Sequence, residues 1–161
     1  MDRAALTFVG AFALHVLEEA PGFTAWARRY ASERYTQRDF VRNNALGLGI
    51  TGAATYVVAR SSRRRGVFLV YYSTIFTQQA LFNTIFHAGT TVAWRAYSPG
   101  LITSLTLFLP LWLSTTHLAL DDGLITRRGA VLASALGGAI HAGAVAQQVF
   151  FIGVPEARDR G

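Results

Sequence analysis

The chain has 161 residues, enough for one domain, and with 52% hydrophobic and only 15% charged residues it is too apolar for an ordinary soluble fold. All fifteen basic residues are arginines between apolar runs, so the net charge of +6 indicates contact with anionic lipid headgroups and no nucleic-acid partner. The absence of cysteine excludes disulfides, thiolate metal sites, iron–sulfur clusters and cysteine nucleophiles.

Five apolar stretches are long enough to cross a hydrocarbon core of about 30 Å, which takes about 20 helical residues. We therefore predict an all-α integral membrane bundle of five transmembrane helices, forming a single domain over residues 1–161. The predicted spans cover about residues 4–20, 43–59, 67–94, 101–120 and 129–152.

Residues 22–42, between the first two predicted spans, alternate aromatic and basic side chains, with Trp26, Tyr30, Tyr35 and Phe40 among five arginines. This mixture is typical of an amphipathic helix in the headgroup plane, with its rings inserted in the bilayer and its arginines on phosphates. We favour this interfacial role over a phosphate-substrate site.

The arginine block 63–65 lies in a tight loop, and the positive-inside rule favours the cytoplasmic side for it and hence for the N-terminus. The first apolar run leads directly into Glu18 and Glu19 without a small-residue cleavage site, so we expect no cleaved signal peptide. We expect an integral protein of the bacterial plasma membrane.

The four histidines all fall inside predicted spans, each on a different one, and two acids and an asparagine join them. Ionisable groups inside a bilayer are costly unless they are paired, so such groups indicate a functional site that faces the bundle interior. His15 precedes the two acids by three and four residues, and Asn83 precedes His87 by four, so each set shares one helix face. The candidate site residues are His15, Glu18, Glu19, Asn83, His87, His117 and His141.

The predicted depths decide which of these residues meet. The first, third and fifth spans run in the same direction, and their polar residues lie at or beyond the helix midpoint, so we expect His15, His87 and His141 to converge. The fourth span runs the other way and places His117 near the opposite face, which makes it a second-tier candidate.

The motif HVLEE near the N-terminus is followed by FNTIFH, by YSPGLIT leading into LFLPLWLSTTH, and by a late histidine in a glycine-rich span. This order resembles the HXXEE family of small integral membrane proteins, over about residues 10–145. The resemblance implies that His15, Glu18, Glu19, Asn83 and His87 are the residues that matter, and it implies no reaction.

Neutral imidazole and carboxylate groups are ligands for zinc and non-haem iron, and the sulfur-free set here suits one ion of either metal. We expect His15, Glu19, His87 and His141 as ligands, with His117 as a further candidate. Glu18 would orient a histidine or act as general base, with Asn83 as a further catalytic residue.

We therefore predict a small membrane enzyme with a metal-dependent site, acting on a hydrophobic or lipid-like small molecule that enters from the bilayer. One alternative is a metal-free isomerase or cyclase in which Glu18 and Glu19 donate and accept the proton. Another is a proton- or metal-conducting module built from the same side chains, although only His117 would serve its other half.

Overall fold

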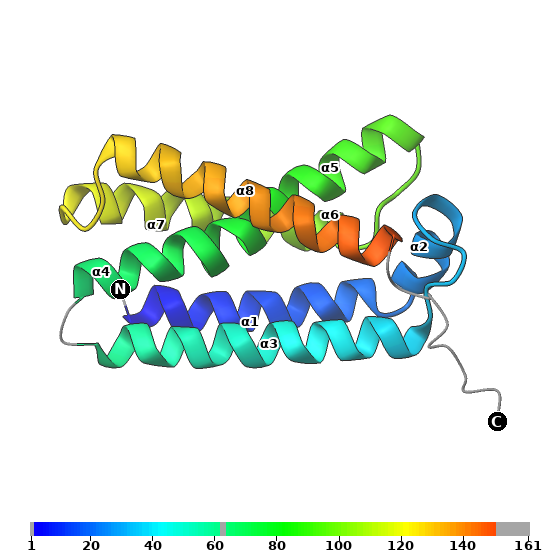
Figure 1. Ribbon diagram of the computed structural model, residues 1–161, viewed down its shortest axis with the longest axis horizontal. Coiled ribbons are helices and arrows are strands. Elements are labelled where there is room, and N and C mark those ends of the chain that lie inside the picture. The colour runs from blue at the N-terminus through cyan, green and yellow to red at the C-terminus, as the bar shows by residue number, and fades with distance from the viewer. Residues whose placement is uncertain (1, 62–63, 151–161) are drawn as a thin grey trace, which may run out of the picture.

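The computed structural model describes residues 2–61 and 64–150, and all the regular structure in these residues is helical (Figure 1). A central helix runs without a break over residues 64–94 and includes two π-helical segments, and a second one runs over residues 101–121 and includes one. The elements are α1 (Asp2–Glu19), α2 (Phe23–Tyr30), α3 (Gln37–Arg60), α4 (Arg64–Tyr71), η1 (Tyr72–Phe76), η2 (Gln78–Phe82), α5 (Asn83–Trp94), α6 (Leu101–Thr103), η3 (Ser104–Phe108), α7 (Leu109–Asp121) and α8 (Arg127–Phe150).

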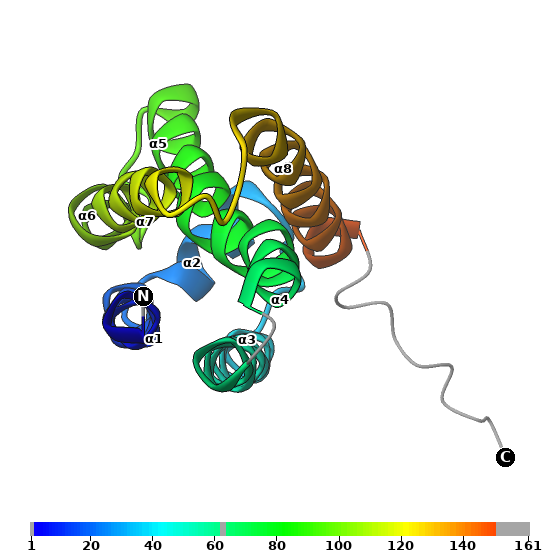
Figure 2. The ribbon, with the colours of Figure 1, turned by 90° about the vertical axis from the view of Figure 1, so that its left-hand side faces the viewer.

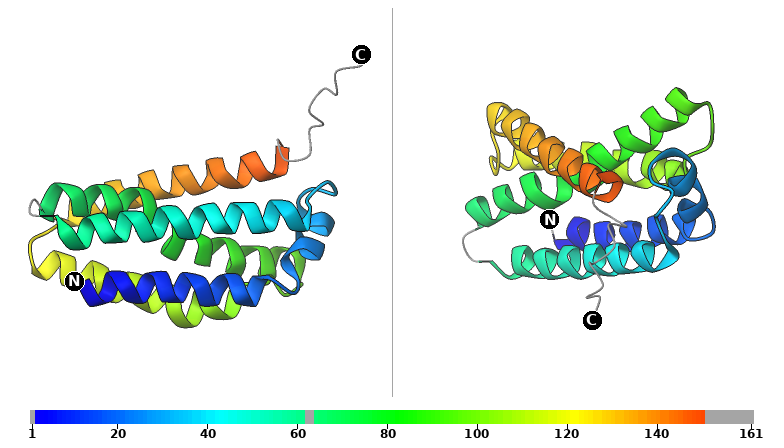
Figure 3. Two further views of the ribbon diagram at one scale, coloured as in Figure 1. Left: turned by 90° about the horizontal axis from the view of Figure 1, so that it is seen from below. Right: turned by 45° about the vertical axis from the view of Figure 1, so that its right-hand side comes forward.

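The helix from α4 to α5 lies in the middle of the bundle. Helices α1 and α3 pack side by side below it in Figure 1, and α7 and α8 cover its other side (Figure 2). The short helix α2 lies across the end of the bundle where α1 ends and α3 begins (Figure 3). The loop from α5 to α6 reaches the same end, so α2 and this loop enclose the carboxyl end of α1.

An aromatic core holds α1 against the central helix and α6–α7. The ring of Phe8 lies 4.9 Å from that of Phe76 and 5.7 Å from that of Phe108, centroid to centroid, and all three side chains are buried. Edge-to-face and tilted aromatic pairs of this kind add to the free energy of apolar burial. The packing fixes the position of α1, and with it the position of the HVLEE residues at its end.

The prediction of five transmembrane helices is wrong, although helices occupy most of each predicted span. By length and composition, two of the described helices could cross a membrane, Leu101–Asp121 and Arg127–Gln147. The other stretches contain polar or charged residues that lower their mean hydropathy. Helix α1 carries acids at its end, α3 begins with polar residues, and the central helix contains serine, threonine, glutamine, asparagine and histidine.

Three of the aromatic rings in residues 22–42 are not available for insertion into a bilayer, which corrects that part of the predicted interfacial role. Trp26, Tyr35 and Phe40 are buried and form a second apolar cluster inside the protein. The segment is also not one helix: α2 ends at Tyr30, and α3 begins at Gln37 behind a capping box between Thr36 and Asp39. The rings therefore hold α2 against the bundle.

Candidate metal centre

The last turn of α1 carries the three ionisable residues of the HVLEE motif. His15 and Glu19 are separated by four residues and lie on the same helix face, with His15 Nε2 3.5 Å from Glu19 Oε1. Glu18 lies on a different face and points toward the start of α6, where its carboxylate accepts hydrogen bonds. The two adjacent acids therefore have different surroundings.

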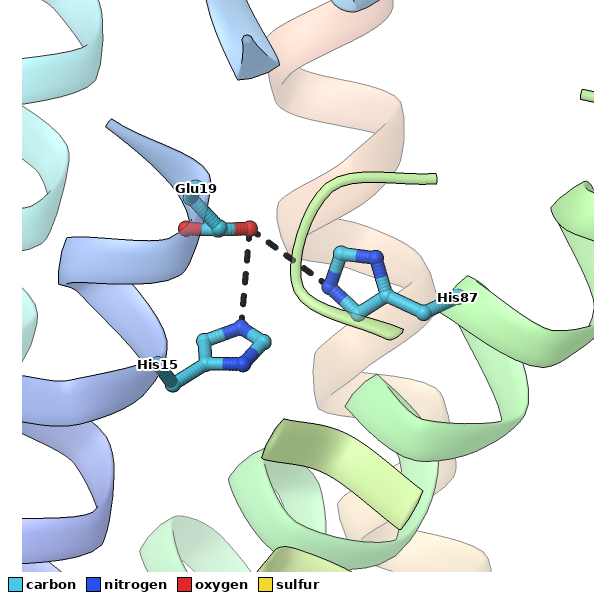
Figure 4. Close-up of side chains that lie close together, drawn as sticks. All are labelled: His15, Glu19 and His87. Carbon is cyan, nitrogen blue, oxygen red and sulfur yellow. Dashed lines mark ion pairs between the residues drawn. The ribbon is translucent and has the colours of Figure 1, made fainter. Parts of the chain in front are cut away.

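Glu19 lies between two histidines from different helices (Figure 4). Its Oε1 atom is 3.5 Å from His15 Nε2 on α1 and also 3.5 Å from His87 Nε2 on α5. One candidate ligand atom from each residue lies within 4.8 Å of the other two. The exposed fractions of His15, Glu19 and His87 are 1%, 6% and 0%, so the group is out of contact with bulk solvent.

The Thr103 hydroxyl fixes the protonation pattern of His15. This hydroxyl donates to the Glu18 carboxylate, so it must accept the 2.8 Å hydrogen bond from His15 Nδ1. A neutral His15 ring therefore carries its proton on Nδ1 and directs the Nε2 lone pair toward Glu19. This arrangement of carboxylate, hydroxyl and imidazole is of the kind that orients metal-binding histidines in proteins.

His87 is held in a similar way by the loop between α5 and α6. Its Nδ1 atom lies 2.8 Å from the Ser98 hydroxyl, and the Ser98 backbone N–H donates to Thr91 Oγ1. The Nε2 atom of His87 is fully buried and has no hydrogen-bond partner among the described residues. An imidazole nitrogen without a partner, 3.5 Å from a carboxylate oxygen, is a ligand atom that a cation could use.

Gly100 lets the two imidazole rings approach each other. Its φ of +102° lies in the left-handed region that favours glycine. A Cβ atom there would lie 2.6 Å from Cε1 of His15 and 2.8 Å from Cε1 of His87, distances that side chains do not tolerate. The glycine of the YSPG element therefore forms one wall of the site.

Glu18 binds the amino-terminal end of the helix that α6 begins. Its carboxylate accepts from the backbone N–H groups of Gly100, Ile102 and Thr103 and from the hydroxyls of Tyr97 and Thr103. Burial raises the pKa of Glu18, but these hydrogen bonds outweigh burial and lower it to about 2. Glu18 is thus an ionised cap, contributed by α1 to another helix.

Burial disfavours charge at the two groups that face each other across the site. It raises the pKa of Glu19 above the usual 4.5. Burial also lowers the pKa of His87 to about 3. A divalent cation between them would compensate the buried carboxylate and would suit a neutral imidazole.

The spacing of the ligand atoms can be compared with that of a tetrahedral zinc or iron centre. With bonds of about 2.0 to 2.1 Å, two ligand atoms of such a centre lie about 3.3 to 3.5 Å apart. Glu19 meets this spacing with both histidines at 3.5 Å, and the widest separation within the group is at most 4.8 Å. The three residues could therefore hold one ion.

A cavity of about 390 Å³ opens from this cluster into the end of the bundle. Asparagine and glutamine side chains line part of it, and aromatic rings from α2 and α5 line another part. This volume falls in the range of small-molecule binding sites. Its lining includes Phe23, Trp26, Tyr30, Gln78, Asn83, Phe86, Trp94 and His141.

Three other residues singled out from the sequence have different positions. Asn83 lies in the site, with its amide nitrogen 2.9 Å from His15 Nε2. His141 lines the same cavity, where its Nδ1 atom lies 3.3 Å from the Gln78 amide nitrogen, but it is not part of the three-residue cluster. His117 lies outside the site, 75% exposed and 3.4 Å from Asp121 on its own helix.

Sequence reasoning missed the residues that orient the ligands. Tyr97, Ser98 and Thr103 contact Glu18, His87 and His15 through hydroxyl groups, and hydroxyls are too common for their spacing to reveal such a role. A usable signal was the Pro-Gly pair at 99–100, because glycine after proline in a short connection indicates a backbone close to something bulky. The cavity-lining role of Trp26 and Tyr30 had no comparable signal.

Comparisons with curated proteins and with solved structures found no match to this chain. A family model described as "Protein of unknown function with HXXEE motif" matches residues 6–115, which include His15, Glu18, Glu19, Asn83 and His87 together with the YSPG loop. That range covers more than half of the 161 residues. The chain therefore belongs to the HXXEE family of proteins.

Proposed function

We propose that this protein is a metal-dependent membrane enzyme in which His15, Glu19 and His87 hold one zinc or non-haem iron ion. The observation that carries the proposal is the convergence of three buried ligand atoms, within 4.8 Å, next to a cavity of about 390 Å³. Two histidines and one carboxylate leave coordination positions open, as catalytic zinc and non-haem iron sites do.

The bound ion would supply Lewis acidity, toward a water molecule or a carbonyl group of the substrate. The chain's own groups would orient the reactants around it. Thr103 and Ser98 hold the two imidazoles through their Nδ1 atoms, which leaves both Nε2 atoms directed toward Glu19. Asn83 would then turn its amide from His15 Nε2 to an oxygen of the substrate, since the metal takes that lone pair.

A membrane location supports a hydrophobic, lipid-like substrate. Two helices are long and apolar enough to span a bilayer, and large apolar side chains are exposed on other helices as well, for example Leu17 on α1 and Val92 on α5. We expect the substrate to reach the cavity from the lipid phase.

A metal-free acid–base enzyme is the second candidate, and one contact favours it. The Asn83 amide donates to His15 Nε2 at 2.9 Å, which occupies the lone pair that a metal would need. In this version Glu19 would carry a proton between the substrate and the two histidines, each 3.5 Å from its Oε1 atom. Glu18 would not act as its partner, because five hydrogen bonds hold it as a cap.

Elemental analysis of the detergent-purified protein distinguishes the two candidates. We expect about one equivalent of zinc or iron in the wild type and in His117→Ala, whose histidine is exposed and outside the site. Glu19→Gln and His87→Ala should each lose the metal while keeping the helical circular dichroism of the wild type. Metal well below one equivalent in folded wild type, purified without chelator, would reject the metal enzyme and favour the acid–base one.

A further inference from the structure

Besides His87 Nε2 in the metal cluster, two more buried nitrogens of cavity-lining residues have no hydrogen-bond partner among the described residues: Trp26 Nε1 and His141 Nε2. Both rings contact Phe86, with centroid distances of 5.8 Å for Trp26 and 5.9 Å for His141. They come from α2 and α8, helices far apart in the sequence, and neither nitrogen belongs to the metal cluster. The cavity thus has a second polar region beside Phe86.

Both nitrogens are donors. The indole Nε1–H of tryptophan can only donate. For His141, the amide nitrogen of Gln78 lies 3.3 Å from Nδ1, and an amide nitrogen donates, so Nδ1 accepts. A neutral His141 ring therefore carries its proton on Nε2, facing no acceptor from the described residues. A buried donor without a partner costs about 1 to 3 kcal/mol, so an occupant of the cavity that supplies acceptors would be bound favourably.

Close packing fixes both donors in place. The Trp26 ring lies 5.2 Å from that of Trp94, which in turn stacks on Tyr30 at 4.9 Å. One turn before His141, a Cβ at Gly137 would lie 3.1 Å from the Ser73 carbonyl oxygen, so α8 approaches η1 closely there. Donors held this rigidly lose little conformational entropy when a ligand binds.

Aromatic rings connect this region to the metal cluster. The Phe23 ring lies 6.5 Å from that of His87 and 5.5 Å from that of Trp26. A single apolar ring therefore separates the orphaned indole from a metal-binding imidazole, and both residues line the same cavity. A ligand that spans the two regions needs an apolar body with an acceptor oxygen at some distance from the group that meets the metal.

We propose that Trp26 and His141 form a carbonyl-recognition subsite, and that the occupant of the cavity is an apolar ketone or ester whose oxygen atoms accept from Trp26 Nε1–H and His141 Nε2–H. The identification of this occupant with the substrate rests on the proposed function above. Neither donor recognises a hydrocarbon, and neither supplies an acceptor to a ligand that can only donate.

Nuclear magnetic resonance of the indole N–H groups tests the subsite, with methyl nonyl ketone and undecane as matched probes. The protein has three tryptophans, and Trp26→Phe assigns the Trp26 signal. The ketone should move the Trp26 indole proton downfield, and undecane should not. The Trp112 signal is the internal reference, because this indole already donates to Thr77 at 3.3 Å.

Binding measurements with the same probes give the matched controls. The wild type should bind the ketone about tenfold more tightly than undecane, which corresponds to about 1.4 kcal/mol for the hydrogen bonds gained. Trp26→Phe and His141→Phe should remove this preference and leave undecane binding unchanged, whereas Trp112→Phe should keep it. Equal affinity of the wild type for ketone and alkane, or a Trp26 signal that does not respond to the ketone, would overturn the proposal and assign both donors to water.

The proposed metal enzyme and the proposed subsite can be rejected independently of each other. Glu19→Gln should lose the metal and keep the ketone preference, because neither Trp26 nor His141 is part of the metal cluster. Wild type without metal but with the ketone preference would reject the proposed enzyme and retain the subsite. Wild type with one equivalent of metal and no ketone preference would do the reverse.

Discussion

Glu18 and Thr103 are joined by two hydrogen bonds, one from the Thr103 backbone N–H at 2.7 Å and one from its hydroxyl. The backbone bond caps the helix that starts at α6, and the hydroxyl is the same one that accepts from His15 Nδ1. The first acid of the motif therefore acts on helix geometry and on the orientation of His15, while the second acid, Glu19, faces the cavity.

Replacement of Thr103 by valine should lower metal affinity about 10- to 100-fold, the usual effect of losing a partner that orients a ligand. The reason is that His15 Nδ1 loses its acceptor, so the ring and its tautomer are no longer fixed. Thr103→Ser keeps the hydroxyl and should bind metal close to wild type. Nitrogen-15 chemical shifts of His15 report the tautomer directly, and an Nδ1–H tautomer retained in Thr103→Val would contradict this role.

Replacement of Gly100 by alanine should abolish metal binding and destabilise the fold by about 2 to 4 kcal/mol. The added Cβ would lie 2.6 Å from His15 Cε1 at a backbone φ of +102°, so it forces the two imidazoles apart. Gly123→Ala is the matched control, because Gly123 has φ of +66° with nothing within 4 Å.

The control should cost about 1 kcal/mol for its backbone conformation and leave metal content unchanged. Thermal unfolding and elemental analysis of both variants provide the comparison. Full metal content in Gly100→Ala would mean that the rings need not approach at this point.

Stability in acid should depend on Glu18. Its pKa is lowered from 4.5 to about 2 in the folded protein, so the unfolded chain binds the proton more readily. The stabilising contribution is therefore complete above about pH 4.5 and is lost as the pH falls through about 2. Glu18→Gln should be less stable than wild type by about 1 to 2 kcal/mol near neutral pH and should lack this acid dependence.

The pH dependence of the unfolding midpoint in detergent measures this effect. The exposed Glu33, in the connection between α2 and α3, offers the control variant Glu33→Gln, which should follow the wild-type curve. If the unfolding midpoints of wild type and Glu18→Gln changed in parallel between about pH 4.5 and 2, Glu18 would not be the source of the acid dependence.

Metal affinity should fall as the pH falls, because protons and metal compete for the carboxylate. Burial raises the pKa of Glu19, so the competition begins at a higher pH than for an ordinary glutamate, whereas His87, with a pKa of about 3, stays available well below neutral pH. Competitive titration with a chromogenic chelator at a series of pH values measures this affinity. A constant affinity from about pH 7 to 4 would exclude a buried carboxylate as ligand.

Much of the site could be predicted from spacing alone. The four-residue separations of His15 from Glu19 and of Asn83 from His87 are helix periodicities, and both pairs lie in the site as their spacing requires. The role of Glu18 could not be predicted, because it depends on where the YSPG loop and α6 meet α1. Three-dimensional contacts between segments some 80 residues apart leave no local pattern.

The helical class could also be predicted, but the membrane spans were overestimated. Helix α3 contains charged and polar residues, among them Arg38, Asp39 and Arg42, that bring it below the hydropathy that spanning requires. Only Leu101–Asp121 and Arg127–Gln147 meet it among the described helices. The aromatic residues of 22–42 have the composition of a membrane-surface helix. Their burial is a tertiary effect, since Trp26 of α2 and Phe40 of α3 belong to one apolar cluster that separate helices form together.

X-ray absorption spectroscopy of the metal-loaded protein identifies the ligands of the ion. We expect two imidazole nitrogens at about 2.0 to 2.1 Å and carboxylate oxygen at about 2.0 to 2.2 Å, with imidazole scattering reduced to one ring in His87→Ala. A first shell of oxygen atoms without imidazole scattering, or a spectrum unchanged in His87→Ala, would contradict a centre built from His15, Glu19 and His87.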